Sequence, residues 1–257
     1  LGADVDLVGA EPNGYNINDR CGSTHVESLC RRVLETGADI GLAFDGDADR
    51  LIVVDDRGDV VDGDVMLAIL AKALDRRGQL RHKTIVATVM SNLGLERMTE
   101  ANGYTLVRAA VGDRYVLERM LADDYVIGGE QSGHIILLDD TTTGDGQLTA
   151  LRLLGAFRRD ERLSDVRRIM RALPQVLVNV HVPNALKKAV MDHATLAEAR
   201  TATEAKLGNR GRVLIRPSGT EPSIRVMLEG DQYDEIEAYA EDLKRTIETL
   251  LANDLGE

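Results

Sequence analysis

The stretch Asp45-Gly46-Asp47-Ala48-Asp49-Arg50 places three carboxylates at alternate positions between two short apolar runs. Those runs, residues 40–44 and 51–55, are predicted as strands, so the acidic residues form the loop between them. In an extended loop alternate side chains point the same way, and all three carboxylates can converge on one point. Uncompensated, they would repel each other. A Mg²⁺ ion removes that cost, because it takes oxygen ligands and usually shares its shell with a phosphate.

Other interpretations of this acidic loop fit less well. An EF-hand needs glycine where Arg50 stands and glutamate where Asp56 stands, and its flanks are helices. A haloacid-dehalogenase phosphatase needs Gly-Thr after its second aspartate, and here Ala48 and Asp49 follow. A solvated acidic turn remains as the alternative without function.

A second polar stretch, Gly128-Gly129-Glu130-Gln131-Ser132-Gly133-His134, leads into another predicted strand. Glu130 and Ser132 share one face at a period of two and could bind vicinal hydroxyl groups. His134 could transfer a proton near neutral pH, although a histidine satisfied within the loop is an equal alternative. We expect ligand contact for Glu130.

A third stretch, Arg216-Pro217-Ser218-Gly219-Thr220-Glu221-Pro222, lies between two predicted strands and is followed closely by Arg225. Its guanidinium and hydroxyl groups, with a glycine that lets backbone N–H groups approach, suit a phosphate. Pro-Ser-Gly is also ordinary turn chemistry, so a polar turn is the alternative.

Strands and helices alternate outward from these loops, which predicts an α/β fold. The best domain boundary lies near Leu173-Pro174, and a weaker one near Gly63-Asp64. After residue 174 the pattern changes to a strand, a helical stretch, two strands and a last helix. The strands expected are 5–8, 40–44, 51–55, 84–89, 104–109, 125–127, 134–138, 176–182, 212–216 and 224–228. The helices expected are one after a Thr24/Glu27 capping box that ends at Gly37, then 64–77, 92–103, 113–122, 145–159, 186–207 and 233–251.

Composition narrows the function. Of 257 residues, 44% are hydrophobic and 29% charged, as in a folded globular protein, and the net charge is -12. Such an acidic surface argues against nucleic-acid or anionic-membrane binding. Two cysteines without a CxxC pattern indicate reduced thiols and a cytoplasmic location, and no apolar run is long enough to cross a membrane. The opening Leu1-Gly2-Ala3-Asp4 reads like the end of a helix, so we expect the chain to start inside a fold.

The three polar stretches, in this order and spacing, resemble the metal, sugar and phosphate loops of the α-D-phosphohexomutases. The resemblance covers essentially the whole chain and is closest to the phosphoglucosamine mutase branch. The segments that carry this closer resemblance are Asn16-Ile17-Asn18, Cys21-Gly22-Ser23-Thr24-His25, Met90-Ser91-Asn92-Leu93-Gly94, Val111-Gly112-Asp113-Arg114-Tyr115-Val116 and Pro174-Gln175-Val176-Leu177-Val178-Asn179.

The resemblance implies part of domain II in residues 1–63, domain III in 64–172, and in 173–257 a small α+β domain IV resembling the TATA-binding-protein-like fold. It implies an enzyme that interconverts glucosamine 6-phosphate and glucosamine 1-phosphate through a bisphosphate. It also implies that the phosphoserine domain is missing and that this chain alone is inactive. Mannose or glucose mutases, and a phosphosugar-binding fragment without catalysis, remain alternatives, and a homodimer is left open.

In this family-based interpretation the site residues fall into four groups. They are the Mg²⁺ ligands Asp45, Asp47 and Asp49, the catalytic residues Arg50 and His134, the sugar-binding residues Glu130 and Ser132, and the phosphate-binding residues Arg216, Ser218, Gly219, Thr220 and Arg225.

Overall fold

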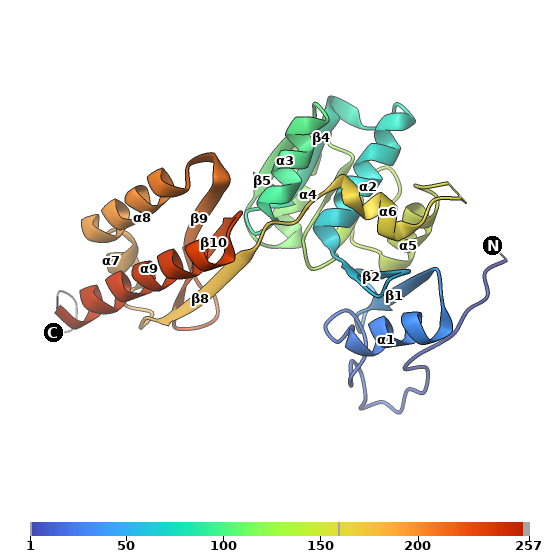
Figure 1. Cartoon of the computed structure of the whole chain (residues 1–257), viewed down its shortest axis with the longest axis horizontal. Coiled ribbons are helices and arrows are strands. Elements are labelled where there is room, and N and C mark those ends of the chain that lie inside the picture. Colours follow the sequence, from blue (N-terminus) through green and yellow to red (C-terminus); the bar gives the residue numbers. More distant parts are fainter. Residues whose placement is uncertain (1, 159, 254–257) are drawn as a thin grey trace. The chain divides into compact units, whose positions relative to one another are not determined.

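The computed structural model describes residues 2–158 and 160–253, which pack as two compact units, unit 1 (Leu1–Arg171) and unit 2 (Ala172–Glu257). Figure 1 labels their elements along the chain. In the part of the chain that the structure describes, no helix is long and apolar enough to cross a membrane.

Unit 1 begins with an irregular segment, which α1 and a small sheet follow. The sheet is antiparallel in the order β1-β2-β3, and Phe44 pairs with Leu51 across the acidic loop. These elements are α1 (Glu27–Thr36), β1 (Ile40–Phe44), β2 (Leu51–Asp55) and β3 (Val60–Val61). β2 is buried along its whole length, and both α1 and α5 pack against it.

Two predictions for this region are wrong. Residues 5–8 form no strand, and Val5 and Leu7 are exposed because no described strand lies beside them to pair with. The capping box is also absent, since α1 begins after Val26 without a side-chain cap. The predicted end is confirmed, because Gly37 takes the left-handed conformation that closes the helix.

The rest of unit 1 is an α/β layer around a four-stranded sheet in the order β5-β4-β6-β7. β5, β4 and β6 run parallel and β7 runs antiparallel to β6. The strands are β4 (Thr84–Thr88), β5 (Thr105–Ala109), β6 (Ile127–Gly129) and β7 (Ile135–Leu137). The helices are α2 (Gly63–Arg76), α3 (Leu93–Ala101), α4 (Asp113–Ala122), α5 (Gly146–Leu154) and α6 (Leu163–Val166), with 3-10 turns η1 (Arg81–Lys83) and η2 (Arg167–Ile169).

The predicted α/β class is confirmed, with shifts at element ends. The strand expected at 125–127 lies at Ile127–Gly129, where it pairs with β4 through two glycines. α5 stops at Leu154, before Gly155, although we expected this helix to span residues 145–159.

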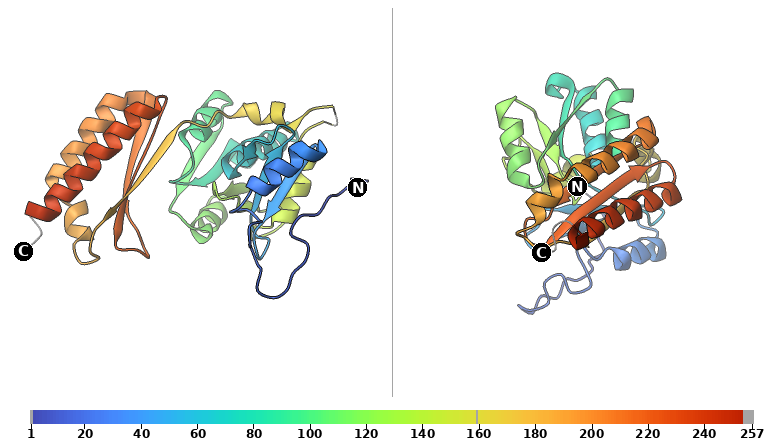
Figure 2. Two further views of the ribbon diagram at one scale, coloured as in Figure 1. Left: turned by 60° about the horizontal axis from the view of Figure 1, so that its bottom comes forward. Right: turned by 90° about the vertical axis from the view of Figure 1, so that its left-hand side faces the viewer.

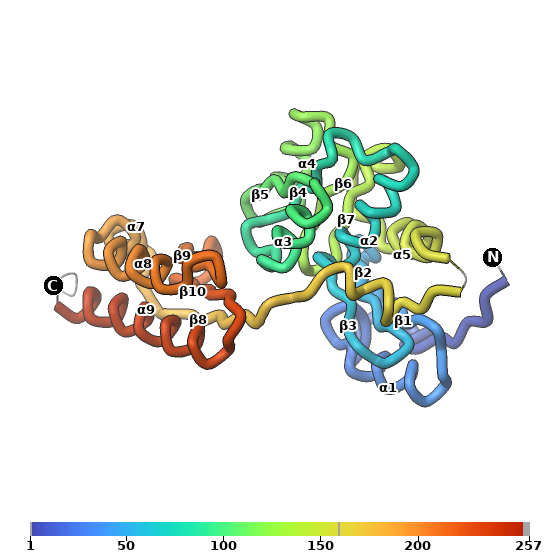
Figure 3. The backbone as a smooth tube through the Cα atoms, turned by 45° about the horizontal axis from the view of Figure 1, so that its top comes forward, coloured from blue at the N-terminus to red at the C-terminus, as the bar shows by residue number. Residues whose placement is uncertain are grey.

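Asp55, the last residue of β2, and Asp56 after it bond to the chain that follows α5 and passes the first sheet (Figure 3). Asp56 accepts hydrogen bonds from the backbone N–H and hydroxyl of Ser164, each at 3.0 Å. Burial alone would raise the pKa of Asp56, but these bonds outweigh it and hold that pKa below the ordinary value. The fully buried Asp55 accepts from Arg167 at 3.1 Å. These contacts explain why residues on both sides of the expected 63/64 boundary pack as one unit.

Tyr104 gives unit 1 a pH-dependent hydrogen bond. The ring is 7% exposed and the hydroxyl donates to Asp75 at 2.8 Å, while Lys83 bonds the same carboxylate. Burial, and then the bond to Asp75, raise the pKa of Tyr104 from 10 to about 12. Because the folded-state value is raised, this stabilisation is complete below pH 10 and is lost as the pH rises to about 12.

We therefore expect Tyr104→Phe to lower the thermal midpoint by a few degrees at pH 8 and by much less near pH 12. Melting curves of both proteins across this range test it, with Tyr115→Phe, at an exposed tyrosine, as the control. If the difference in thermal midpoint between wild type and Tyr104→Phe stayed constant up to pH 12, the hydrogen bond from Tyr104 to Asp75 would not be the source of this stability.

Unit 2 is an antiparallel sheet in the order β8-β10-β9, with α8 and α9 side by side on one face of it (Figure 2). Its apolar core lies between those helices and the sheet. The elements are β8 (Gln175–His181), α7 (Lys187–Met191), α8 (Ala194–Leu207), η3 (Gly208–Arg210), β9 (Gly211–Pro217), β10 (Ser223–Gly230) and α9 (Tyr233–Asn253). The expected order of strands and helices is confirmed. The likeness of this unit to the TATA-binding-protein-like fold stays a prediction.

Candidate metal and phosphosugar site

The acidic loop brings its three carboxylates together. One oxygen each of Asp45, Asp47 and Asp49 lies within 4.8 Å of the others. Ala48 turns the loop with a positive φ of 59°, and its N–H donates to the carbonyl of Asp45 at 3.2 Å. Arg50 closes the loop, because its N–H donates to Asp45 Oδ1 at 3.1 Å. The convergence predicted from the alternating pattern is thus present.

The pKa of Asp49 shows that bringing the carboxylates together is electrostatically unfavourable. Burial raises the pKa of Asp49, and the adjacent Asp45 raises it further. For Asp45 burial works in the same direction, but hydrogen bonds, first from the Arg50 N–H, hold its pKa below the ordinary value. Asp49 Oδ1 is buried without a hydrogen-bond partner. A carboxylate oxygen left in this state beside two others suits a hard cation such as Mg²⁺.

The loop predicted to bind sugar, residues 128–134 (the sugar loop), is joined to the acidic loop through the backbone. Arg50 and His134 form an isolated antiparallel bridge, and the N–H of Leu51 donates to the carbonyl of Gly133 at 3.1 Å. Gly133 has φ +94°, and a Cβ there would lie 2.0 Å from the Leu51 carbonyl oxygen. Only glycine fits this crossing, so it sets the spacing between the two loops.

Glu130 lies at the carboxyl end of β6, where the ends of β4 and β5 also meet because the three strands are parallel. Ligands of open α/β sheets bind at this edge. Glu130 Oε1 accepts from the N–H of Gly112 at 3.0 Å, and Oε2 is 3.5 Å from the hydroxyl of the exposed Ser132. The two side chains expected to bind sugar hydroxyls therefore do share one face.

His134 is nearly buried, with 3% of the residue exposed. Its Nε2 lies 3.6 Å from Asp49 Oδ2 and 4.0 Å from Asp113 Oδ2, and its Nδ1 has no partner. Against one face lies Gly144, where a Cβ would come within 2.4 Å of Nε2. This position suits a residue that orients Asp49, and the expected proton transfer stays a prediction.

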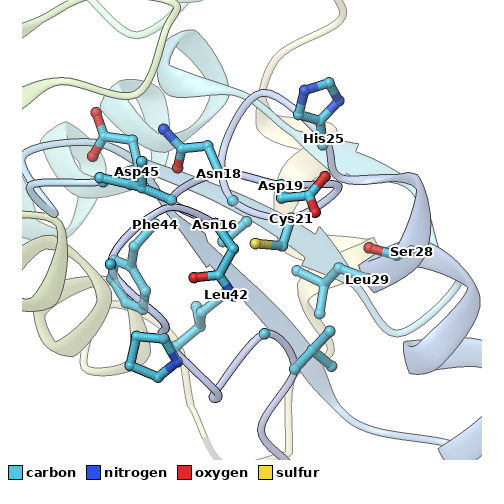
Figure 4. Close-up of a pocket in the computed structure, with 18 residues that line it drawn as sticks. Asn16, Asn18, Asp19, Cys21, His25, Ser28, Leu29, Leu42, Phe44 and Asp45 are labelled. Carbon is cyan, nitrogen blue, oxygen red and sulfur yellow. The ribbon is translucent and has the colours of Figure 1, made fainter.

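The polar loop that carries Asn16, Asn18 and His25 lines a cavity of about 580 Å³ beside the metal loop (Figure 4). Leu42 and Phe44 of β1 contribute apolar walls. Asn18 and Asp45 lie at one end of the cavity (Figure 4). Composition alone gave this loop no role, and the structure places it against the metal loop.

In unit 2 the loop predicted to bind phosphate, residues 216–222 (the phosphate loop), is bounded by two arginines that face each other. They are Arg216 on β9 and Arg225 on β10. Burial, and then the charge of Arg225, lower the pKa of Arg216. The Nε atoms of both arginines are buried without hydrogen-bond partners. Like charges opposite each other are unfavourable, and here the repulsion is offset in part because Arg225 Nη2 donates to the carboxylate of Glu221 at 3.1 Å. Ser218 is buried and its hydroxyl accepts from the N–H of Glu221 at 3.2 Å, while Gly219 and Thr220 are exposed.

Sequence reasoning gave the loop after β7 no definite role. Asp145 caps α5 by accepting from the N–H of Leu148, and the N–H of Gly146 donates to the carbonyl of Ala48 at 2.9 Å. A Cβ at Gly146 would lie 2.7 Å from the Arg50 carbonyl oxygen. The glycines flanking Asp145 were the available signal, since they permit this close approach.

Three family models match the chain in sequence order. They are described as phosphoglucomutase/phosphomannomutase alpha/beta/alpha domain II at residues 2–58, alpha/beta/alpha domain III at 62–176 and the C-terminal domain at 177–246. The chain belongs to the phosphoglucomutase/phosphomannomutase family. Curated relatives are named phosphoglucosamine mutase. The chain is 54% identical over 252 residues to that of Thermoanaerobacter sp. (strain X514) and 52% identical to that of Acetivibrio thermocellus. Each match covers 98% of this chain and 56% of the relative, so the chain spans little more than half their length.

Solved structures with low sequence identity show a similar fold. One is the Aspergillus fumigatus N-acetylphosphoglucosamine mutase in complex with GlcNAc-6P and magnesium, with a TM-score of 0.70 and 18% identity over 89% of this chain and 56% of that one. Another is a phosphoglucomutase/phosphomannomutase family protein from Burkholderia thailandensis, with a TM-score of 0.71 and 23% identity over 96% of this chain and 53% of that one.

Proposed function

We propose that the complete protein, meaning this chain together with a segment that carries a phosphoserine, is a phosphoglucosamine mutase. It interconverts glucosamine 6-phosphate and glucosamine 1-phosphate for amino-sugar nucleotide synthesis. The observation that carries this proposal is the direct backbone junction between the carboxylate loop and the sugar loop at Arg50 and His134. Such a junction keeps a sugar and a metal-bound phosphoryl group at a fixed separation.

The reaction we propose consists of two phosphoryl transfers. The phosphoserine gives its phosphoryl group to the free hydroxyl of the sugar phosphate, which forms glucosamine 1,6-bisphosphate and leaves a free serine. The bisphosphate then turns over, and its other phosphoryl group returns to the serine. The serine lies outside these 257 residues in this proposal, because the matched family models are those of domains II, III and IV.

Each group of side chains has one task in this scheme. Asp45, Asp47 and Asp49 would hold Mg²⁺, which when bound would neutralise charge on the transferring phosphoryl group. Arg50, 44% exposed and within 4 Å of two of these carboxylates, is placed to add positive charge there. Glu130 and Ser132 would bind ring hydroxyls that both orientations of the sugar present.

The arginines of unit 2 would grip the phosphate that does not react. The Nε donors of Arg216 and Arg225 lack acceptors, although Arg225 Nη2 is bonded to Glu221, and the exposed Gly219 and Thr220 leave the loop open to an anion. Ser218 would contribute its hydroxyl proton while its oxygen still accepts from Glu221. The three-domain division, a homodimer and the cytoplasmic location stay predictions.

The test compares this chain with a version extended through the phosphoserine domain, in a coupled assay with glucosamine 6-phosphate. We expect turnover only in the extended form, and none after its serine is replaced by alanine. Glucose 6-phosphate and mannose 6-phosphate as substrates distinguish the alternative mutases. Turnover by the 257 residues alone would place the phosphoryl carrier within them and would refute the proposal.

A further inference from the structure

Lys187 lies under the phosphate loop and bonds it at both ends. Its Nζ donates to the carbonyl of Ser218 at 2.7 Å and to the carbonyl of Glu221 at 2.5 Å. Lys187 is the first residue of α7 and is half-buried. Within the described part of the chain its ammonium pairs with no carboxylate, so its charge is directed at the loop alone.

Other bonds also shape this loop: the N–H of Ser223 donates to the carbonyl of Glu221 at 2.8 Å, the N–H of Val182 donates to that of Pro222 at 2.9 Å, and Arg225 Nη2 donates to the Glu221 carboxylate at 3.1 Å. Ser218 and Ser223 join its ends through an N–H···O bond of 2.9 Å, and the Ser218 hydroxyl accepts from Glu221. Pro217 and Pro222 flank the loop and have no N–H to donate. The ammonium is the group that bonds a backbone carbonyl at each end of the loop, and both of its bonds are charge-assisted.

The carbonyls that Lys187 holds are the groups that would repel an anion. The loop's remaining backbone donors are still available, because in the described structure the N–H groups of Gly219 and Thr220 have no acceptor. A Cβ built on Gly219 meets no atom within 4 Å, so the approach to these donors is open. Fixing the carbonyls while leaving the donors free produces a concavity suited to phosphate.

We propose that Lys187 is the positioning residue of the phosphate loop. It holds the loop in its anion-binding shape and adds positive charge beneath it, without contacting the phosphate. This inference rests on the proposed function. Because the non-reacting phosphate is gripped equally before and during the transfer, losing this support weakens substrate binding and leaves the chemical step unchanged.

The test uses glucosamine 6-phosphate with the complete protein. We expect Lys187→Met to raise KM roughly tenfold and to leave kcat within about twofold of wild type. This is the result when an interaction contributes equally to binding of the substrate and of the transition state. Lys187→Arg, which keeps the charge and the donors, should recover most of the affinity. Lys188→Met is the matched control, because Lys188 follows in the same helix and is exposed. If Lys187→Met does not fold, Lys187→Gln, which keeps a donor and removes the charge, replaces it.

A second measurement uses the 257-residue chain and inorganic phosphate, followed by amide chemical shifts of Gly219 and Thr220. We expect phosphate to shift these amide signals in wild type and in Lys188→Met. In Lys187→Met the same shift should need roughly tenfold more phosphate. If Lys187→Met lowers only the melting temperature while KM and the titration match wild type, the inference is overturned and the proposed function stands. If wild type and Arg216→Met respond alike, the phosphate assignment of the loop fails, and the inference fails with it.

Discussion

Replacing Asp47 by alanine is expected to lower kcat/KM of the complete protein at least about a thousandfold, since metal stabilisation of a transferring phosphoryl group contributes several kcal/mol and each 1.36 kcal/mol is tenfold. Asp47 is the exposed member of the three carboxylates, so its loss leaves no buried cavity. The effect should therefore fall on metal affinity with little change in folding. Coupled turnover at a Mg²⁺ concentration that just saturates the wild type measures it, with Asp39→Ala as control at an exposed aspartate just before β1.

The 257-residue chain gives an independent readout of the same change. Without divalent cations Asp47→Ala should be as stable as wild type or slightly more stable, because one of three mutually repelling carboxylates is gone. Millimolar Mg²⁺ should raise the melting temperature of wild type and leave the variant unchanged, since a ligand stabilises only the state that binds it. Undiminished turnover in the variant, or equal stabilisation of both proteins by Mg²⁺, would contradict the metal assignment.

The loop between β1 and β2 and the loop between β9 and β10 could be predicted from sequence, because their evidence is local. Alternating aspartates between two short apolar runs fix both the loop and the direction of its side chains. The strands at residues 40–44 and 51–55 were correct for the same reason, since each apolar run is short and is bounded by polar residues. Residues 5–8 have the same apolar character and form no strand, because a strand also requires a neighbour with which to pair.

The connections between loops could not be predicted, because each depends on tertiary packing. Nothing near Arg50 indicates that its backbone will pair with His134, far along the chain. Nothing in the sequence around Lys187 shows that its ammonium reaches the carbonyls of Ser218 and Glu221. Sequence therefore indicated which polar groups to expect in each loop, while the structure supplied the contacts that hold these loops in place.

Arg167→Met is expected to destabilise unit 1 strongly. Asp55 is fully buried, and Arg167 is its cation, at 3.1 Å. Removing one partner of a buried ion pair leaves an uncompensated charge and costs about 3–5 kcal/mol. Arg167 is 28% exposed, so we expect the lower end of this range. At roughly 2–4 °C for each kcal/mol, the melting temperature should fall by about 6–12 °C.

A charge-removal rescue separates this mechanism from lost packing. Asp55 also accepts from the N–H groups of Arg57 and Asp59, so Asp55→Asn keeps an oxygen for these bonds while it removes the charge that needs Arg167. The double variant Asp55→Asn/Arg167→Met should therefore melt above Arg167→Met alone, and the coupling energy from the four proteins measures the pair. Arg168→Met, at an exposed arginine of the same turn, is the control and should change little. If Arg167→Met and Arg168→Met have the same melting temperature, the backbone donors alone satisfy the buried carboxylate of Asp55. The ion pair then contributes nothing to holding the first sheet against the α/β layer.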